Sequence, residues 1–85
     1  MKALEILNTL SKILEKFAGK HQKSETKIII DYNDNRFEIS RNHNRINAYL
    51  NGEPTDFGLN VDTATDSDVH EFGLNLYEFI FNCDF

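Results

Sequence analysis

Apolar residues recur at helical spacing in the first part of the chain. Over residues 2–18 they fall on one broad stripe, and polar residues occupy the other side. Glu5 lies near the N-terminal end of this segment and Lys16 near its C-terminal end, where their charges complement the helix dipole. We predict an amphipathic helix over 2–18 that ends at Gly19 and buries its stripe in the core. The stripe consists of Ala3, Ile6, Leu7, Leu10, Ile13, Leu14 and Phe17.

Residues 27–50 alternate between apolar and polar positions with a period of two, which is typical of strands that bury one face. Two interruptions are rich in Asn and Asp, which tolerate positive φ and bond their own backbone. The pattern predicts an antiparallel β-meander whose Ile and Phe side chains face the first helix. The expected strands cover 27–32, 36–40 and 45–50, the expected turns 33–35 and 42–44, and a polar connector 20–26 precedes them.

A fourth strand can follow the Asn51-Gly52 pair, which is a strong signal for a two-residue hairpin turn. Apolar residues alternate over 57–61, as a strand requires. Pro54 and Gly58 favour a strand that is short or lies at the edge of the sheet.

The segment 69–83 carries two conflicting signals. Its polar residues recur at helical spacing with apolar residues opposite them, and Asp66 or Ser67 is a good N-cap. Against a helix, Gly73 is costly in a helix interior, and residues 76–81 have strong strand propensity. We favour a helix here and keep a strand as the alternative.

The expected elements make one α+β domain that spans 1–85. An amphipathic helix packs on a three- or four-stranded antiparallel β-meander, and a C-terminal helix or strand follows. At 85 residues the chain has room for one hydrophobic core and no cleft between two domains. So small a core leaves little stability for a strained active site, which favours a binding protein over an enzyme.

Charge divides the chain into two unequal parts. All nine Lys and Arg residues lie within 1–45, and the net charge is −5 at pH 7. Residues 46–85 contain acidic side chains and no Lys or Arg, which repels like-charged polymers and attracts basic partners. The same imbalance also serves solubility, which is the simpler interpretation. The acidic residues of the second part are Glu53, Asp56, Asp62, Asp66, Asp68, Glu71, Glu78 and Asp84.

The residue types needed for catalysis are present only as scattered side chains. His21, His43 and His70 lie apart in polar segments, and Cys83 has no basic neighbour in sequence that would lower its pKa. A nucleophile beside an oriented base is not indicated, and a Gly-rich phosphate loop is missing. We therefore expect no enzymatic activity and no nucleotide cofactor.

The four carboxylates between residues 62 and 71 suggest a cation site, but their spacing does not fit one. Counted from Asp62, an EF-hand would place a ligand at Ala64 and a Gly at Ser67. One Cys and three separated His residues also lack the ligand spacing of a zinc site. We therefore expect these acids to cap a helix and to bind no metal.

The cysteine count and the lengths of the apolar runs indicate the cellular compartment that we expect for this protein. The single Cys83 cannot form an internal disulfide, which is typical of a reducing compartment, and we expect a cytoplasmic protein. Glu5, Lys12 and Glu15 interrupt the first apolar stretch, so it does not read as a signal peptide. No run of 18 apolar residues is present, and we expect no membrane partner.

Direct nucleic-acid binding is disfavoured by charge. The expected layout is also that of double-stranded RNA-binding domains, which present Lys and Arg at the start of their second helix. In this chain the corresponding region carries Asp66, Asp68 and Glu71. The expected partner is therefore a basic protein, and nucleic acid is not.

A hairpin over residues 28–40 follows an amphipathic helix and precedes the acid-only remainder of the chain. In this layout the chain resembles small phage-encoded inhibitors of host defence nucleases, the anti-CRISPR and anti-restriction proteins. The resemblance implies an acidic surface that imitates DNA and engages a basic, nucleic-acid-handling protein. It also implies that Tyr77 or Phe81 anchors the contact. The acids expected to meet Lys and Arg of the target are Asp56, Asp62, Asp66, Asp68, Glu71 and Glu78.

A second hypothesis is a homo-oligomeric structural or accessory protein. In that case the aromatic segment 77–85 would bury itself against a second copy, and the chain would be a homodimer. The two hypotheses differ in their dependence on salt, because an acidic inhibitor loses affinity as salt rises and a hydrophobic dimer does not.

Overall fold

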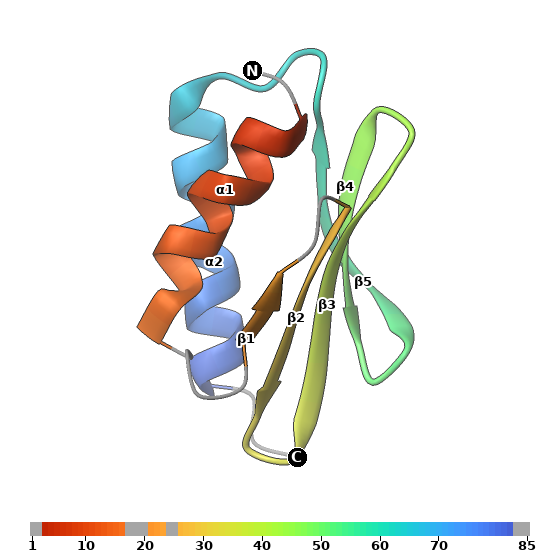
Figure 1. The fold of residues 1–85 in the computed structure, drawn as a ribbon, viewed down its shortest axis with the longest axis vertical. Coiled ribbons are helices and arrows are strands. Elements are labelled where there is room, and N and C mark those ends of the chain that lie inside the picture. The colour runs from red at the N-terminus through yellow and green to blue at the C-terminus, as the bar shows by residue number, and fades with distance from the viewer. Residues whose placement is uncertain (1–2, 17–20, 24–25, 83–85) are drawn as a thin grey trace.

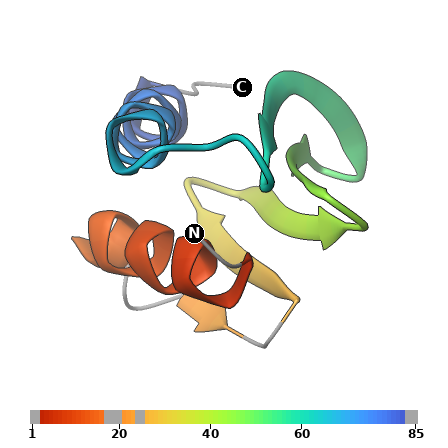
Figure 2. The same cartoon turned by 90° about the horizontal axis from the view of Figure 1, so that it is seen from above.

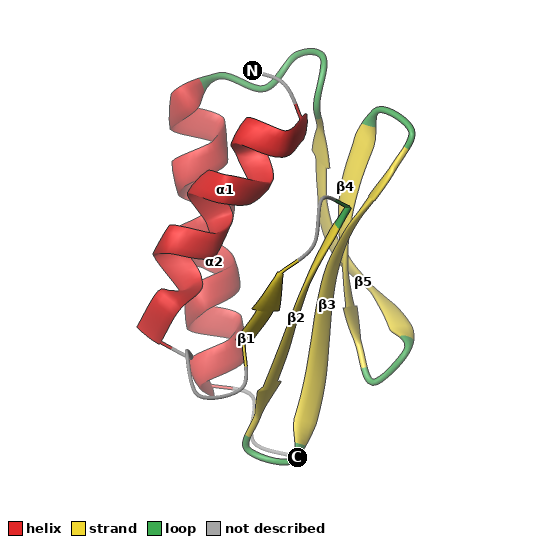
Figure 3. Ribbon diagram, in the orientation of Figure 1, coloured by secondary structure: helices red, strands yellow, loops and turns green. Residues whose placement is uncertain are grey.

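A computed structural model describes residues 3–16, 21–23 and 26–82. In these ranges the chain forms one helix, then five strands, then a second helix (Figure 1 and Figure 3). The elements are α1 (Ala3–Ile13), β1 (His21–Lys23), β2 (Lys27–Tyr32), β3 (Asn35–Asn42), β4 (Arg45–Leu50), β5 (Glu53–Asn60) and α2 (Asp66–Asn82). The predicted α+β class, the antiparallel meander and the C-terminal helix are confirmed.

The sheet is a meander in which each strand pairs antiparallel with the next, in the order β1-β2-β3-β4-β5. Both helices lie on the same side of this sheet, and its other face is left without a helix (Figure 2). The register aligns buried side chains across neighbouring strands: Ile28 lies opposite Ile39, which lies opposite Ala48. The predicted inward face of the meander is therefore the face that packs on the helices.

Two of the hairpins turn on two residues with positive φ, the backbone shape that matches the twist of antiparallel strands. Asn33 and Asp34 have φ values of 54° and 65°, and Asn51 and Gly52 have values of 51° and 85°. The turn between β3 and β4 has positive φ at His43. The Asn- and Asp-rich segments of the sequence thus form turns where they were predicted, with Asn35 and Asn42 belonging to the strands.

One expectation about a segment between elements was wrong, and the bounds of the first helix differ from those predicted. The connector predicted over 20–26 contains β1, in which residues 21–23 pair with residues 30–28 of β2. A three-residue edge strand needs only backbone pairing, so its polar side chains gave no apolar alternation to detect. The predicted helix over 2–18 is α-helical only over Ala3–Ile13 and continues as a 3₁₀ turn over 14–16, and Phe17 and Gly19 lie outside the described residues.

The possible fourth strand is longer than predicted and lies at the edge of the sheet, as Pro54 suggested. It covers Glu53–Asn60 and pairs with β4 through an irregular register between Asn47 and Tyr49. At this bulge the Thr55 hydroxyl donates a hydrogen bond of 2.7 Å to the Ala48 carbonyl. The side chain thereby replaces a backbone partner that the bulge removes.

The segment 66–82 is helical despite Gly73, which was one of the two sequence arguments against a helix. Gly73 is buried where α2 crosses α1, and a Cβ added there would lie 2.5 Å from Ile13 Cδ1 and 3.2 Å from Leu10 Cδ2. The glycine therefore permits a close approach of the two helices, and the packing compensates for its low helix propensity. The buried residues of α2 lie on the side of the helix opposite its exposed residues. They are Val69, Phe72, Gly73, Leu76 and Ile80.

Four phenylalanines connect α2 to the sheet. Phe57 of β5 meets the rings of Phe72 and Phe79 at centroid distances of 6.4 and 5.0 Å, and Phe37 of β3 meets Phe79 edge-on at 6.0 Å. Such tilted and edge-on pairs are the favoured geometry of aromatic side chains. They fix the side of α2 that faces the sheet, and so determine which side faces solvent.

Candidate functional site

The six acids predicted to meet a partner are all exposed, and they come from three parts of the chain. Asp56 lies on β5 and Asp62 lies in the turn that follows it. The other four lie on α2 and are Asp66, Asp68, Glu71 and Glu78. Helix α2 therefore holds most of the predicted acidic site.

Glu71 and Glu78 share the outer face of α2, because residues seven apart on a helix lie almost directly above one another. Neither forms an ion pair with a Lys or Arg of the described residues. The ion pairs within the described ranges are Lys27–Glu38 at 3.9 Å and Arg36–Asp31 at 3.0 Å, and both lie on the sheet. The negative charge on this face of α2 is thus left for solvent or for a partner.

Two of the predicted acids have local structural partners instead. Asp68 accepts a hydrogen bond of 3.0 Å from the backbone N–H of Thr65, and the Thr65 hydroxyl accepts one of 3.2 Å from the N–H of Asp68. This reciprocal pair is a capping box, so Thr65 is the N-cap of α2 and the predicted Asp66 or Ser67 is not. The Asp62 carboxylate accepts a bond of 3.3 Å from Asn44 Nδ2, which holds the end of β5 to the β3–β4 turn.

Exposed apolar side chains lie beside the two glutamates. Leu74 is 58% exposed and Phe81 is 59% exposed. The Phe81 ring stacks on Tyr77 with centroids 6.4 Å apart and planes 5° apart, and Lys16 Nζ lies 5.7 Å from the Tyr77 ring centroid. The two predicted aromatic anchors therefore touch each other on the surface of α2.

Leu74 completes this apolar group and was not among the predicted site residues. An apolar residue in an amphipathic helix is ordinarily assigned to the core. The sequence did carry a signal: Leu74 is three residues from Tyr77 and seven from Phe81, a spacing that puts all three on one side of a helix. The site as the structure has it joins Leu74, Tyr77 and Phe81 to Glu71 and Glu78, and we call this set the α2 surface.

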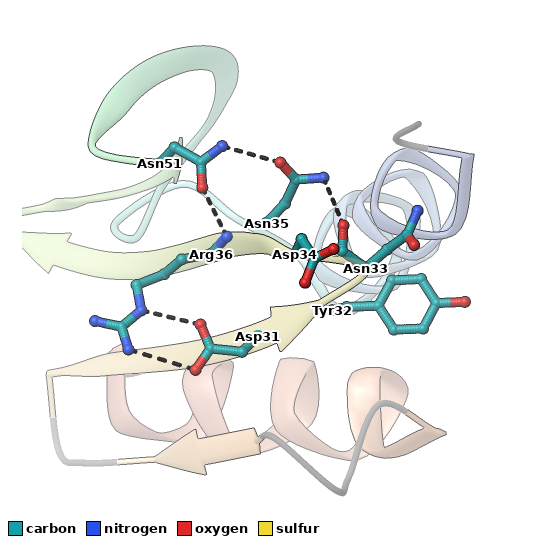
Figure 4. A pocket seen from close by; sticks show the side chains of 7 residues that line it. All are labelled: Asp31, Tyr32, Asn33, Asp34, Asn35, Arg36 and Asn51. Atoms are coloured by element: carbon teal, nitrogen blue, oxygen red, sulfur yellow. Dashed lines mark hydrogen bonds and ion pairs between the residues drawn. The ribbon is translucent and has the colours of Figure 1, made fainter. Parts of the chain in front are cut away.

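A polar depression lies at the end of the sheet where two hairpin turns meet (Figure 4). The Arg36 guanidinium bonds both carboxylate oxygens of Asp31 at 3.0 and 3.4 Å, and this hydrogen bond and charge raise the pKa of Arg36 above its ordinary value. Asn51 donates to Asn35 Oδ1 at 3.0 Å and accepts from the Arg36 N–H at 2.8 Å. Asn35 in turn donates to the Asn33 carbonyl at 3.3 Å.

These contacts join the β2–β3 turn to the β4–β5 turn. Asn35 is 5% exposed and is the buried polar residue of the described core, and both ends of its amide are hydrogen-bonded. No buried side-chain nitrogen or oxygen in the described ranges lacks a partner. The side-chain amides of Asn35 and Asn51 are thus engaged in contacts that stabilise the fold.

The carboxylates near the start of α2 do not gather around a cation position. Within 3–16, 21–23 and 26–82, no group of three or more His, Cys, Asp or Glu side chains is arranged to hold a metal ion. Cys83 and Asp84 lie outside the described residues. None of the helices that the structure describes is long and apolar enough to span a membrane.

No family model, curated protein or solved structure matches this chain.

Proposed function

We propose that this chain is a non-enzymatic, cytoplasmic protein-binding module that inhibits a basic, nucleic-acid-handling protein by occupying its DNA-binding surface. The observation that carries the proposal is the outer face of α2, where Glu71 and Glu78 are exposed and lack a cationic partner among the described residues. Carboxylates held on a rigid helix can meet the Lys and Arg side chains that otherwise bind phosphate.

The distribution of charge supports a protein partner over nucleic acid. No Lys or Arg occurs after Arg45, so α2 carries four carboxylates and neither of these cationic residues. Backbone phosphates would be repelled from this helix. On the sheet, by contrast, two of the cations are engaged with acids, Arg36 with Asp31 and Lys27 with Glu38.

The proposed class of inhibitor is the anti-CRISPR or anti-restriction type. Its support is the order of the elements, with an amphipathic helix, a hairpin meander and an acidic C-terminal helix, together with the small size of the chain. Within this proposal, Glu71 and Glu78 contact the basic target and Tyr77 and Phe81 anchor the contact. Asp56, Asp62 and Asp66 extend the negative field around them.

Capture from a bacterial lysate, with double-stranded DNA as a competitor, tests the proposal. We expect a captured basic protein to be released by DNA and by raised salt, because both compete for the same Lys and Arg side chains. The double variant Glu71→Gln/Glu78→Gln should capture it poorly. The matched control Glu5→Gln/Glu15→Gln makes the same change in net charge on the first helical segment and should capture it as well as the original chain.

Two results would contradict the proposal. The first is a captured protein that DNA does not displace, because the two would then occupy different surfaces. The second is equal capture by the α2 variant and its control, because the location of the charge would then be irrelevant.

Self-association is the second candidate, and the exposed Leu74 and Phe81 favour it. Glu71 and Glu78 oppose it, since two copies of α2 would bring like charges together. Sedimentation equilibrium of the full chain at micromolar concentration distinguishes the candidates. A dimer that persists in high salt would favour the aromatic interface, and a monomer would favour the inhibitor.

A further inference from the structure

Helix α2 carries a second line of residues outside the core, of which one is a histidine and the other three are apolar or aromatic. His70, Leu74, Tyr77 and Phe81 follow one another at spacings of four, three and four residues, which is the spacing of the a and d positions of a heptad. The core line of the same helix is separate and consists of Val69, Phe72, Gly73, Leu76 and Ile80. We call the outer line the α2 seam.

Three of the four seam residues are exposed. Leu74 and Phe81 are more than half exposed, and His70 is exposed as well. Tyr77 is half-buried and stacks on Phe81, so the two rings form one continuous apolar area. A seam of this kind is the surface that one helix offers to another in a coiled-coil contact.

The charges beside the seam define its partner. With Leu74 and Phe81 as a positions, Glu71 and Glu78 both fall at e positions, which face charged residues of the opposing helix. On the other flank Lys16, in the 3₁₀ turn that follows α1, lies over the Tyr77 ring and partly covers that side of the seam. The open flank is therefore acidic along its length.

We propose that the α2 seam docks a helix of the target protein that has apolar residues at heptad spacing and Lys or Arg at the position facing Glu71 and Glu78. This inference rests on the proposed function and names the element of the basic target that is bound. A second copy of the chain does not meet the requirement, because α2 has no Lys or Arg to place opposite those glutamates.

Two synthetic peptides test the charge rule on the full chain. Each spans about three heptads, carries Leu at the a and d positions and is lactam-bridged to hold it helical; one has Lys at its e and g positions and the other has Glu. We expect fluorescence anisotropy to show binding of the Lys peptide, with the Glu peptide weaker by about tenfold or more at low salt. Equal binding of the two peptides, or no binding of the Lys peptide, would overturn the proposal.

Variants of the seam separate this proposal from the broader proposed function. Leu74→Ser/Phe81→Ser should weaken binding of the Lys peptide about tenfold or more while leaving the acids in place. Because both side chains are exposed, the variant should keep the circular dichroism spectrum and melting temperature of the original chain. Glu71→Gln/Glu78→Gln should lose the preference for Lys over Glu, and Glu5→Gln/Glu15→Gln should keep it.

The possible failures differ in what they reject. If the seam variant binds the Lys peptide as tightly as the original chain, the contact is purely electrostatic. The proposal that the seam docks a helix is then rejected, and the proposed acidic inhibitor is not. If the full chain forms a dimer that Phe81→Ser dissolves, a second copy covers the seam and the proposal is overturned. If DNA fails to displace the captured target but the peptide results hold, the inhibitor mechanism is wrong and the seam stands.

Discussion

Asn51 joins two hairpin turns through both its side chain and its backbone. Its side-chain oxygen accepts from the Arg36 N–H at 2.8 Å, and its own N–H donates to the Arg36 carbonyl at 2.7 Å. Its side-chain amide donates to the buried Asn35. The residue also has a φ of 51°, which Asn tolerates better than most residues. Asn51 thus fits the positive φ of its own turn and also hydrogen-bonds the other hairpin.

We predict that Asn51→Gly lowers the free energy of unfolding by about 1–3 kcal/mol, because it keeps the positive φ and leaves the buried Asn35 oxygen without its donor. Asn51→Ala should cost about 1 kcal/mol more, since Ala is strained at positive φ. Urea denaturation followed by circular dichroism measures both. An Asn51→Gly midpoint equal to that of the original chain would mean that the side-chain contacts contribute nothing to stability.

At the scale of elements, the contact between α1 and α2 sets where the outer face of α2 points. Gly73 lies under Ile13 and Leu10, and the rings of Phe72 and Phe79 hold the other side of the helix on β3 and β5. A helix held on both flanks cannot rotate freely. The side chains of the α2 surface are therefore presented in one fixed orientation.

We predict that Gly73→Leu lowers the free energy of unfolding by about 1–3 kcal/mol, because a long side chain has no space between the helices. Leu favours helix over Gly by about 1 kcal/mol, so any loss reflects packing. Gly73→Ala should lie within about 1 kcal/mol of the original chain, since the propensity gain offsets a shift of the flexible Ile13 tip. Urea denaturation tests the pair. A stabilising Gly73→Leu would show that the helices are not in close contact there.

Most of the elements could be predicted because their side chains follow a period. The alternation in 27–50 fixed three strands, and the Asn-Gly pair at 51–52 fixed a hairpin, since both depend on local chemistry. Strand β1 could not be predicted, because a three-residue edge strand carries no periodic signal. The role of Gly73 could not be predicted either, because it depends on which helix crosses it.

The candidate site was predictable in the same limited sense. The acidic character of α2 could be predicted, because no Lys or Arg follows Arg45 in the sequence. The predicted aromatic residues Tyr77 and Phe81 form a pair at the surface. The capping role of Asp68 depends on whether Thr65 or a later residue begins the helix, a choice that the sequence left open. Asp31 and Arg36 are cross-strand partners within one hairpin. Asn51 meets Arg36 and Asn35 only because two separate hairpins end side by side, which no local pattern encodes.

Charge is segregated between the sheet and helix α2. The ion pairs of the described residues lie on the sheet, and the acids of α2 have no cationic partner among them. Both helices lie on one side of the sheet, so the acidic helix is presented on that side (Figure 2). Under the proposed function, we expect a field of this shape to orient a basic partner before contact.

We predict that the association rate of the chain with the Lys peptide falls about tenfold between about 20 and 200 mM salt, while the dissociation rate changes little. Long-range attraction governs the encounter and is screened by salt, whereas the apolar contacts that hold the complex are not. Stopped-flow fluorescence measures both rates. An association rate that does not change with salt would show that the acidic field does not steer binding.

The bulge in β5 bears on how this chain behaves when it is abundant. An outermost strand with a regular, unpaired backbone invites other chains to add to it and grow into aggregates. Here Pro54 lacks an amide hydrogen, and the irregular segment around Thr55 breaks the even row of groups that an incoming strand would need. The molecule can therefore leave Leu74 and Phe81 exposed on its helical side while the β5 edge of its sheet resists fibre growth.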